Sequence, residues 1–355
     1  MTPKYLIFPF FCTLLACLGL ARLAPWLALM DRPDARKQHG REVPVVGGIA
    51  IMLSYVLALK LRGIAGNLTE AMLPVGLMLA VGIVDDVHAL SARFKLALQC
   101  VAAWLLCRTT GFDLTALPIP GFDAGLPLGP FALPLTMFVI LAVINAINMS
   151  DGADGLAGGY VFGALLLLLG VALVAGRPTH VLLIVGLMSS IAGFLACNAR
   201  HPWLARARVF MGDAGALSLG MLICWLAFDL ARGKTPAMPP VLLLYAVALP
   251  LLDMVTVSVR RILRGVSPMS ADRTHLHHIL FLKGLSVEVS VVVLWVAHML
   301  LAGCGFLLWR AGASDAVLLA LLLGAMLAKL VVMRVWEEVR DPSAPVATPR
   351  EHSQL

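Results

Sequence analysis

PFALPLTMFVILAVINAINM, residues Pro130–Met149, is an apolar run without a charged side chain. As a helix it is long enough to cross the roughly 30 Å hydrocarbon core of a bilayer. The whole chain shares this character, because 60% of its 355 residues are hydrophobic, only 13% are charged, and the mean hydropathy is +0.92. A water-facing globule of this size does not carry such a composition. The sequence therefore predicts an integral membrane protein.

Ten further apolar stretches of similar character accompany this run. The expected spans are Tyr5–Met30, Pro44–Ile64, Leu68–Val84, Ala92–Thr109, Pro130–Met149, Gly155–Gly176, Thr179–Asn198, Ala214–Ala231, Met238–Val259, Ser286–Trp309 and Ala316–Met333. The first is too long for the core of a signal peptide. We expect an all-α, polytopic bundle of about eleven transmembrane helices, with one catalytic domain over residues 1–340 and a disordered cytoplasmic tail over residues 341–355.

The basic residues predict the orientation of the chain. With the N-terminus outside, seventeen Lys and Arg side chains fall in loops on one side and eight on the other. The positive-inside rule places the richer side, and the C-terminus, in the cytoplasm. Arg22 and Lys329 lie near the ends of spans, where long side chains can snorkel to the interface. The net charge of +7 does not indicate nucleic-acid binding, because the basic residues form no tract.

Polar side chains gather in the loops expected on the cytoplasmic face. They are Asp31, Arg36, Lys37, His39, Arg41, Asp85, Asp86, Asn145, Asn148, Asp151, Asp154, Asp213, Asp272, His275, His277 and His278, with the aromatic Phe210 close to Asp213 in the sequence. Carboxylates, amides, imidazoles and guanidinium groups on one surface are what a membrane active site would present.

Asp85 and Asp86 end an apolar span as adjacent carboxylates. Such a pair is unfavourable at a helix C-terminus unless a cation or protonation relieves the repulsion. A divalent metal ion would relieve it. The alternative is an ordinary solvated helix end.

The stretch NAINMSDGADGL, Asn145–Leu156, places four polar groups at steps of three residues. Residues three apart share a helix face, and the glycines allow a tight turn through which Asp151 and Asp154 can point to one site. The alternative is a set of polar residues that simply cap the end of a span.

The stretch FMGDAG, Phe210–Gly215, precedes the eighth span. Asp213 is a good N-cap, which is the simplest interpretation. A carboxylate beside exposed helix N–H groups and an aromatic ring also suits Mg²⁺ and a stacked base, as in a nucleoside diphosphate.

The stretch DRTHLHH, Asp272–His278, contains three imidazoles in four residues. Zinc is one reading, but the spacing is unlike that of structural zinc sites and no cysteine is near. With Arg260, Arg261 and Arg264 upstream, a surface for phosphates is favoured, and a solvated basic loop is the alternative. Asp253, inside the ninth span, is either functional or paired with a neighbouring helix.

These motifs together resemble the polyprenyl-phosphate N-acetylhexosamine-1-phosphate transferases (glycosyltransferase family 4). The resemblance runs in order through DRPDARKQH from Asp31, VPVVGG from Val43, GIVDD ending at Asp86, the Asn145–Leu156 stretch, Phe210–Gly215, and Ser267 to His278. HLHH at His275 is most similar to the branch that transfers N-acetylglucosamine 1-phosphate to undecaprenyl phosphate, since the phospho-N-acetylmuramoyl-pentapeptide transferases carry three consecutive histidines.

The resemblance implies a role for each matched residue. Catalytic roles fall to Asp85, Asp86, Asp151, Asp154, His275, His277 and His278; substrate binding to Lys37, His39, Arg41, Asn145, Asn148, Phe210 and Arg273; and metal binding to Asp213, Asp85 and Asp86. Phe210 would stack on uracil and Asp154 would contact its edge. The implied cofactor is Mg²⁺, with Mn²⁺ as a substitute.

The implied reaction moves N-acetylhexosamine 1-phosphate from a UDP-sugar to undecaprenyl phosphate and starts a cell-surface polysaccharide such as O antigen. The expected partners are UDP-N-acetylhexosamine, undecaprenyl phosphate and membrane lipids, with no nucleic acid and with a homodimer left open. The expected location is the bacterial inner membrane, with a periplasmic N-terminus and a cytoplasmic active site. The alternatives are the phospho-N-acetylmuramoyl-pentapeptide transferase step of peptidoglycan synthesis and, from another class, a secondary transporter.

Overall fold

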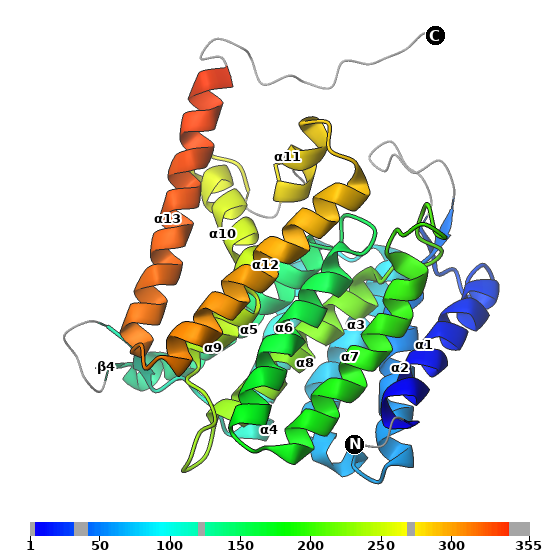
Figure 1. Ribbon diagram of the computed structural model, residues 1–355, viewed down its shortest axis with the longest axis horizontal. Coiled ribbons are helices and arrows are strands. Elements are labelled where there is room, and N and C mark those ends of the chain that lie inside the picture. Colours follow the sequence, from blue (N-terminus) through cyan, green and yellow to red (C-terminus); the bar gives the residue numbers. More distant parts are fainter. Residues whose placement is uncertain (1–3, 32–41, 120–124, 268–273, 341–355) are drawn as a thin grey trace.

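The computed structural model describes residues 4–31, 42–119, 125–267 and 274–340. The first turn of its first helix and the last turn of its last helix lie at opposite ends of the bundle (Figure 1). The predicted disordered tail, residues 341–355, lies outside the described residues.

Helices occupy all eleven of the predicted stretches (Figure 1). They are α1 (Lys4–Leu23), α2 (Gly47–Leu61), α3 (Thr69–His88), α4 (Ala92–Thr110), α5 (Ala132–Met149), α6 (Leu156–Val174), α7 (Pro178–Asn198), α8 (Gly212–Ala231), α9 (Val241–Ala246) with α10 (Ala248–Leu263), α12 (Val287–Arg310) and α13 (Asp315–Arg340). Seven of the described helices are long and apolar enough to cross a membrane. The all-α polytopic membrane fold is confirmed, while the count of eleven crossings and the orientation stay predictions.

Two details of the helices differ from the prediction. The ninth stretch is divided between α9 and α10 at Val247, which has non-helical dihedral angles. Pro250 lacks the N–H that would bond to the carbonyl four residues earlier, so a continuous helix would lose a hydrogen bond here. The histidine segment forms a short helix, α11 (Leu276–Leu282), which the sequence analysis did not predict.

Helix α8 is the central helix of the bundle, with 94% of its membrane-length window buried. It packs against α2, α3 and α5 through small residues. A Cβ added to Gly48 would lie 2.1 Å from the Gly215 nitrogen, and one added to Gly82 would lie 2.3 Å from the Ala214 Cα. Glycine at both positions is therefore required for the backbones to approach this closely.

The loops before α2 and before α8 are joined by backbone hydrogen bonds. The Phe210 N–H donates to the Pro44 carbonyl at 2.8 Å, and the Gly47 N–H donates to the Phe210 carbonyl at 2.9 Å. Two short antiparallel ribbons complete the loops, β1 (Met30–Asp31) with β2 (Val43–Pro44) and β3 (Ala116–Leu117) with β4 (Leu126–Pro127). Two 3₁₀ turns, η1 (Ala65–Leu68) and η2 (Gly129–Phe131), precede α3 and α5.

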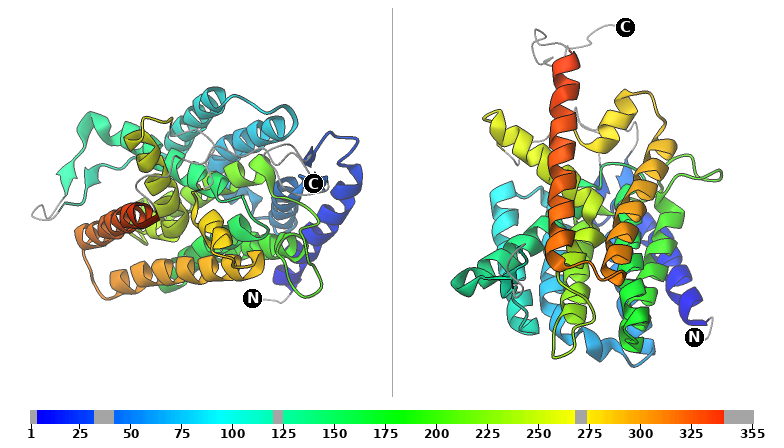
Figure 2. Two further views of the ribbon diagram at one scale, coloured as in Figure 1. Left: turned by 90° about the horizontal axis from the view of Figure 1, so that it is seen from above. Right: turned by 60° about the vertical axis from the view of Figure 1, so that its left-hand side comes forward.

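Helices α12 and α13 lie at the edge of the bundle (Figure 2). Leu300 on α12 and Val332 on α13 expose 68% and 66% of their surface. Apolar side chains this exposed are suited to lipid rather than to water, which agrees with a membrane location.

We expect Gly82→Val to prevent normal packing of α3 on α8, because its Cβ would overlap the Ala214 backbone. Overpacking of this kind costs about 1–3 kcal/mol or more. Thermal unfolding of the purified variant in detergent measures the loss. Gly76→Val on the same helix is the control, since nothing lies within 4 Å of a Cβ there. Equal melting temperatures for the two variants would contradict the tight α3–α8 contact.

Candidate functional site

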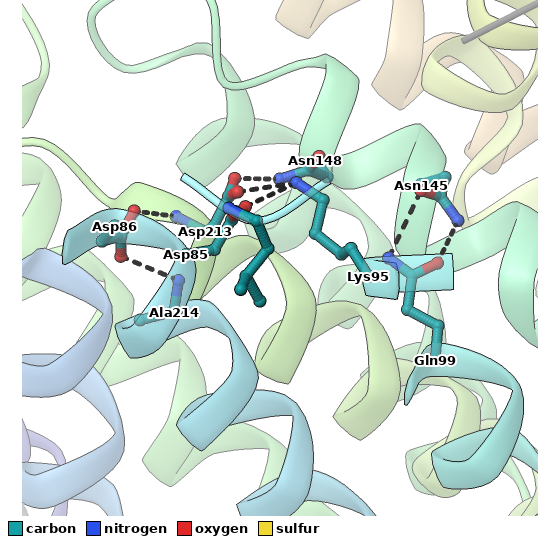
Figure 3. A network of polar contacts seen from close by, with 9 residues as sticks. Asp85, Asp86, Lys95, Gln99, Asn145, Asn148, Asp213 and Ala214 are labelled. Atoms are coloured by element: carbon teal, nitrogen blue, oxygen red, sulfur yellow. Dashed lines mark hydrogen bonds and ion pairs between the residues drawn. The ribbon is translucent and has the colours of Figure 1, made fainter. Parts of the chain in front are cut away.

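The centre of the site is a lysine held between two carboxylates (Figure 3). Lys95 Nζ, near the start of α4, lies 2.7 Å from Asp85 Oδ2 on α3 and 2.8 Å from Asp213 Oδ2 on α8. Asn148 Nδ2, from the end of α5, donates to the other oxygen of Asp213. Four helices therefore converge on one pair of acids, in agreement with the predicted grouping of Asp85, Asn148 and Asp213.

Asp86 has a different surrounding from its neighbour Asp85. Its Oδ1 accepts the Asp213 N–H at 2.9 Å and its Oδ2 accepts the Ala214 N–H at 3.1 Å (Figure 3). The first N–H groups of a helix have no acceptor within the helix. Asp86, on α3, accepts two of these N–H groups from α8. The geometry thus gives Asp86 the task of holding the start of α8, and the metal-binding and catalytic roles assigned to it stay predictions.

Asp85 and Asp213 offer oxygen ligands that fit a hard divalent cation. Mg²⁺ in proteins is commonly bound by one or two carboxylates together with waters and substrate phosphates. These two carboxylates already converge on a single cationic atom, Lys95 Nζ. Among the described residues no three His, Cys, Asp or Glu side chains are arranged as a metal site. Waters and substrate phosphates would complete the coordination of an ion held by Asp85 and Asp213.

Asp151 lies in the turn between α5 and α6, beside the start of α8. A backbone hydrogen bond from Gly212 favours its charged form, but burial and the nearby carboxylates of Asp213 and Asp86 outweigh it and raise the pKa of Asp151 to about 7. Without a bound cation this acid therefore holds a proton near neutral pH.

Asp154 is bound by residues of the loop before α8. Its Oδ2 lies 2.7 Å from Arg200 Nε and accepts the Ala207 N–H at 3.2 Å. Arg200 also contacts Glu288 of α12 at 3.1 Å. Burial lowers the pKa of the Arg200 guanidinium, but the two carboxylates together outweigh it, so the pKa is raised. In this structure Asp154 connects loops, and its predicted contact with uracil stays a prediction.

Asn145 is separated from the acidic centre and faces α4 (Figure 3). It exchanges hydrogen bonds with Gln99, at 2.8 and 3.4 Å, and donates to the Leu141 carbonyl at 2.8 Å. Gln99 is buried, so this pair satisfies polar groups inside the bundle. A substrate-binding role for Asn145 has no contact that supports it here and stays a prediction.

The first histidine is held by a charged pair inside the bundle. His275 Nδ1 lies 2.9 Å from Asp253 Oδ2 on α10, and Lys329 Nζ on α13 lies 2.8 Å from Asp253 Oδ1. Asp253 also accepts the Leu276 N–H at 3.2 Å, which fixes the start of α11. Lys329 thus has a carboxylate partner on a neighbouring helix, and the expectation that it snorkels to the interface stays a prediction. Of the two readings of Asp253, the structure supports the paired one.

His277 connects the histidine helix to the turn that carries Asp151. It is 3% exposed, and a Cβ on Gly152 would lie 2.7 Å from its Nε2, so the imidazole packs directly on that glycine. Its Nε2 has no hydrogen-bond partner among the described residues. Burial, with the neighbouring His278 and His275, lowers the pKa of His277 to about 3. His277 is therefore neutral at pH 7 and contributes no positive charge to a phosphate surface.

Phe210 and His278 have fewer described contacts, and four further predicted residues lie outside the described ranges. Phe210 is located by its backbone bonds to the loop before α2, and the His278 ring centroid lies 4.1 Å from that of His277. Lys37, His39, Arg41 and Arg273 lie outside the described residues.

Several residues that organise the site were not predicted. Lys95 was predicted only as a basic loop residue, although a lysine nine residues beyond an Asp-Asp pair is a detectable signal. Buried Asn198 accepts the Gly155 N–H at 2.8 Å and donates to the Val209 carbonyl at 2.9 Å, joining the two site loops. Arg200 acts similarly through Asp154, and nothing in the sequence singled out either residue.

Comparisons with known proteins place these residues in a family. The family described as glycosyl transferase family 4 matches residues 68–231, which include Asp85, Lys95 and Asp213. The undecaprenyl-phosphate alpha-N-acetylglucosaminyl 1-phosphate transferase of Salmonella typhi is 32% identical over 80% of this chain and 77% of its own length. The protein of the same name from Yersinia pestis is 31% identical over 92% and 90%. A probable undecaprenyl-phosphate N-acetylglucosaminyl 1-phosphate transferase of Bacillus subtilis is 32% identical over 78% and 76%.

We expect Asp151→Asn to stabilise the metal-free protein above neutral pH. Folded Asp151 keeps its proton to about pH 7, whereas an unfolded Asp loses it near pH 3.9. Its contribution to stability is therefore lost as the pH rises between these values. Melting temperatures in EDTA at about pH 5 and about pH 8 should show a gain for the variant mainly at the higher pH. Asp154→Asn is the control, because it removes an ion pair to Arg200 and should give no gain.

We expect Lys329→Met to destabilise the protein and the double variant Lys329→Met, Asp253→Asn to recover much of the loss. The single change leaves a carboxylate inside the bundle without its cation, which costs about 3–5 kcal/mol when a buried pair is broken. Thermal unfolding of these two variants and of the single variant Asp253→Asn gives the coupling energy between the residues. If the double variant is no more stable than the single one, the ion pair does not hold α13 to α10.

Proposed function

The chain belongs to glycosyl transferase family 4, and we propose that it transfers N-acetylglucosamine 1-phosphate from UDP-N-acetylglucosamine to undecaprenyl phosphate. It is an enzyme of the phosphosugar-transferase class. The products would be UMP and undecaprenyl-diphosphate-N-acetylglucosamine. The observation that carries the proposal is the convergence of Asp85, Asp213 and Lys95 at the ends of apolar helices, where a lipid and a water-soluble nucleotide can meet.

Asp85 and Asp213 would hold Mg²⁺, for which Mn²⁺ could substitute. The bound ion would neutralise charge on the diphosphate during phosphoryl transfer. Asp86 keeps the start of α8, and with it the Asp213 side chain, in place. Asn148 orients Asp213 from a third helix. These contacts position the carboxylates before any substrate arrives, which lowers the cost of reorganising the site.

The proposed reaction needs little general acid–base catalysis from the protein. An oxygen of the lipid phosphate attacks the sugar-proximal phosphorus, the bond from that phosphorus to the bridging oxygen breaks, and UMP leaves with the electron pair. A phosphate monoester has its second pKa near 6, so the attacking group is already largely a dianion at pH 7. Asp85 is therefore free to hold charge and position rather than to remove a proton. When a divalent cation occupies the carboxylates, Lys95 can bind a phosphate oxygen.

The structure favours this enzyme over a secondary transporter. Transporters of that kind usually bind ions near the bilayer midplane on broken helices. Here Asp85 lies in the last turn of α3 and Asp213 in the first turn of α8, at one end of the bundle. Asp253, the acid inside a predicted span, is already paired with Lys329.

The proposed setting is the bacterial inner membrane, with the acidic site on the cytoplasmic side and the product used to start a cell-surface polysaccharide such as O antigen. The excess of basic residues in the loops at that end supports this orientation.

We expect Asp213→Asn and Asp85→Asn each to lower UMP formation by about 100-fold or more, because either change removes charge that stabilises the transferred phosphoryl group. The assay is release of UMP and formation of a lipid-linked sugar from UDP-N-acetylglucosamine, undecaprenyl phosphate and Mg²⁺. Asp113→Asn is the matched control, since Asp113 pairs with Arg108 at the other end of α4. Retained turnover in either variant would remove that residue from the site.

A panel of donors tests the sugar. We expect turnover with UDP-N-acetylglucosamine and none with UDP-N-acetylmuramoyl-pentapeptide. The reverse preference would favour the peptidoglycan step, and no turnover with any UDP-sugar would contradict the proposed function.

A further inference from the structure

A charged cavity of about 570 Å³ lies at the end of the bundle opposite the Lys95 centre. Its lining includes Glu70 near the start of α3 and Asp229 near the end of α8. On α8, Asp229 is sixteen residues from Asp213, which corresponds to about 24 Å along a helix. The cavity is therefore separate from the site described above.

Most charges in this cavity already neutralise one another. Arg232 lies 2.6 Å from both Glu70 and Asp229, and His180 lies 2.6 Å from Asp229. Arg232 also donates to the Thr110 carbonyl at 2.7 Å. These contacts join α3, α4, α7 and α8 and leave little net charge.

Arg177 is the exception among the charged residues that line the cavity. Its contacts with described residues use only Nη2, which donates to the carbonyl and hydroxyl of Thr235. A guanidinium carries five N–H donors, so most of its capacity is left for a ligand. Arg177 also directly precedes α7, whose first N–H groups add partial positive charge. The end of the cavity at Arg177 is thus suited to one negative charge.

An apolar groove of about 530 Å³ meets the cavity at Arg177. It runs over α6 and α7 and is lined by Ala172, Leu173, Val181 and Leu182. Leu173 is 60% exposed, so the groove opens on the surface that faces lipid. A ligand that fills both spaces needs an anionic group and a hydrocarbon chain.

We propose that this is a binding site for a phospholipid of the surrounding bilayer. Its phosphodiester would bind Arg177 and the start of α7, and an acyl chain would lie in the groove. A phosphodiester carries one negative charge, which matches the one guanidinium that lacks a carboxylate partner here. The position is also suitable, because the membrane-length helices α3, α7 and α8 all have an end at this cavity.

The test is titration of phosphatidylglycerol into the delipidated full-length protein in detergent, followed by native mass spectrometry. We expect one retained phospholipid, bound about tenfold more weakly by Arg177→Gln, as for loss of a charge-assisted hydrogen bond. Lys234→Gln is the matched control, because Lys234 is an exposed cation at the same end that does not line the cavity. Melting temperatures confirm that each variant is folded.

Two further arms separate the possible ligands. Leu182→Trp, which fills the groove, should also weaken binding, and neither diacylglycerol nor inorganic phosphate should displace the phospholipid. Equal affinities for Arg177→Gln and Lys234→Gln would overturn the proposal. Displacement by inorganic phosphate would show a simple anion site, and displacement by diacylglycerol would show that the phosphate is not recognised. None of these measurements depends on UMP formation, so the outcome is independent of the proposed function.

Discussion

A helix that begins inside a bundle leaves N–H groups without partners, and in this protein Asp86 accepts two of them from the start of α8. The contact joins the end of α3 to the beginning of the most buried helix. It can form only because Gly82 and Ala214 allow the two backbones to touch. Asp213 is the second residue of α8, so the same contact determines where its carboxylate lies. The close packing of α3 on α8, the capping of α8 by Asp86 and the position of the Asp213 carboxylate therefore depend on the same contact.

The carboxylates around this point are distinguished by their partners. Asp85 and Asp213 share the Lys95 ammonium, Asp86 accepts backbone N–H groups, and Asp154 is paired with Arg200. Asp151 accepts a backbone hydrogen bond from Gly212 but is buried near other carboxylates, and its pKa is raised accordingly. Lys95 lies between Asp85 and Asp213 and offsets part of their negative charge, and both carboxylates also offer oxygen ligands that suit a divalent cation.

The sequence predicted the helices well because a membrane span is a long and local signal. It predicted that Asp85, Asn148, Asp151 and Asp213 meet, because each ends or begins a span at the same face. The partners of these groups were not predictable in the same way. Gln99 with Asn145, and Lys329 with Asp253, are contacts between helices, and spacing along one helix does not contain them. The break at Val247 and the short helix α11 were missed because both depend on local backbone geometry and tertiary contacts.

A chain of contacts through the histidine segment connects α13, at the edge of the bundle, to the turn that carries Asp151. Lys329 on α13 balances Asp253 on α10, Asp253 holds His275 and the start of α11, and α11 places His277 against Gly152 beside Asp151. Any side chain at Gly152 would overlap the His277 imidazole, because even its Cβ would lie 2.7 Å from Nε2. The neutral state of His277 follows from the same burial, so it can pack on this turn without adding charge to an acidic site. Helices α10 and α13 therefore fix the position of the segment that carries His275 and α11, which lies between two helices of the bundle.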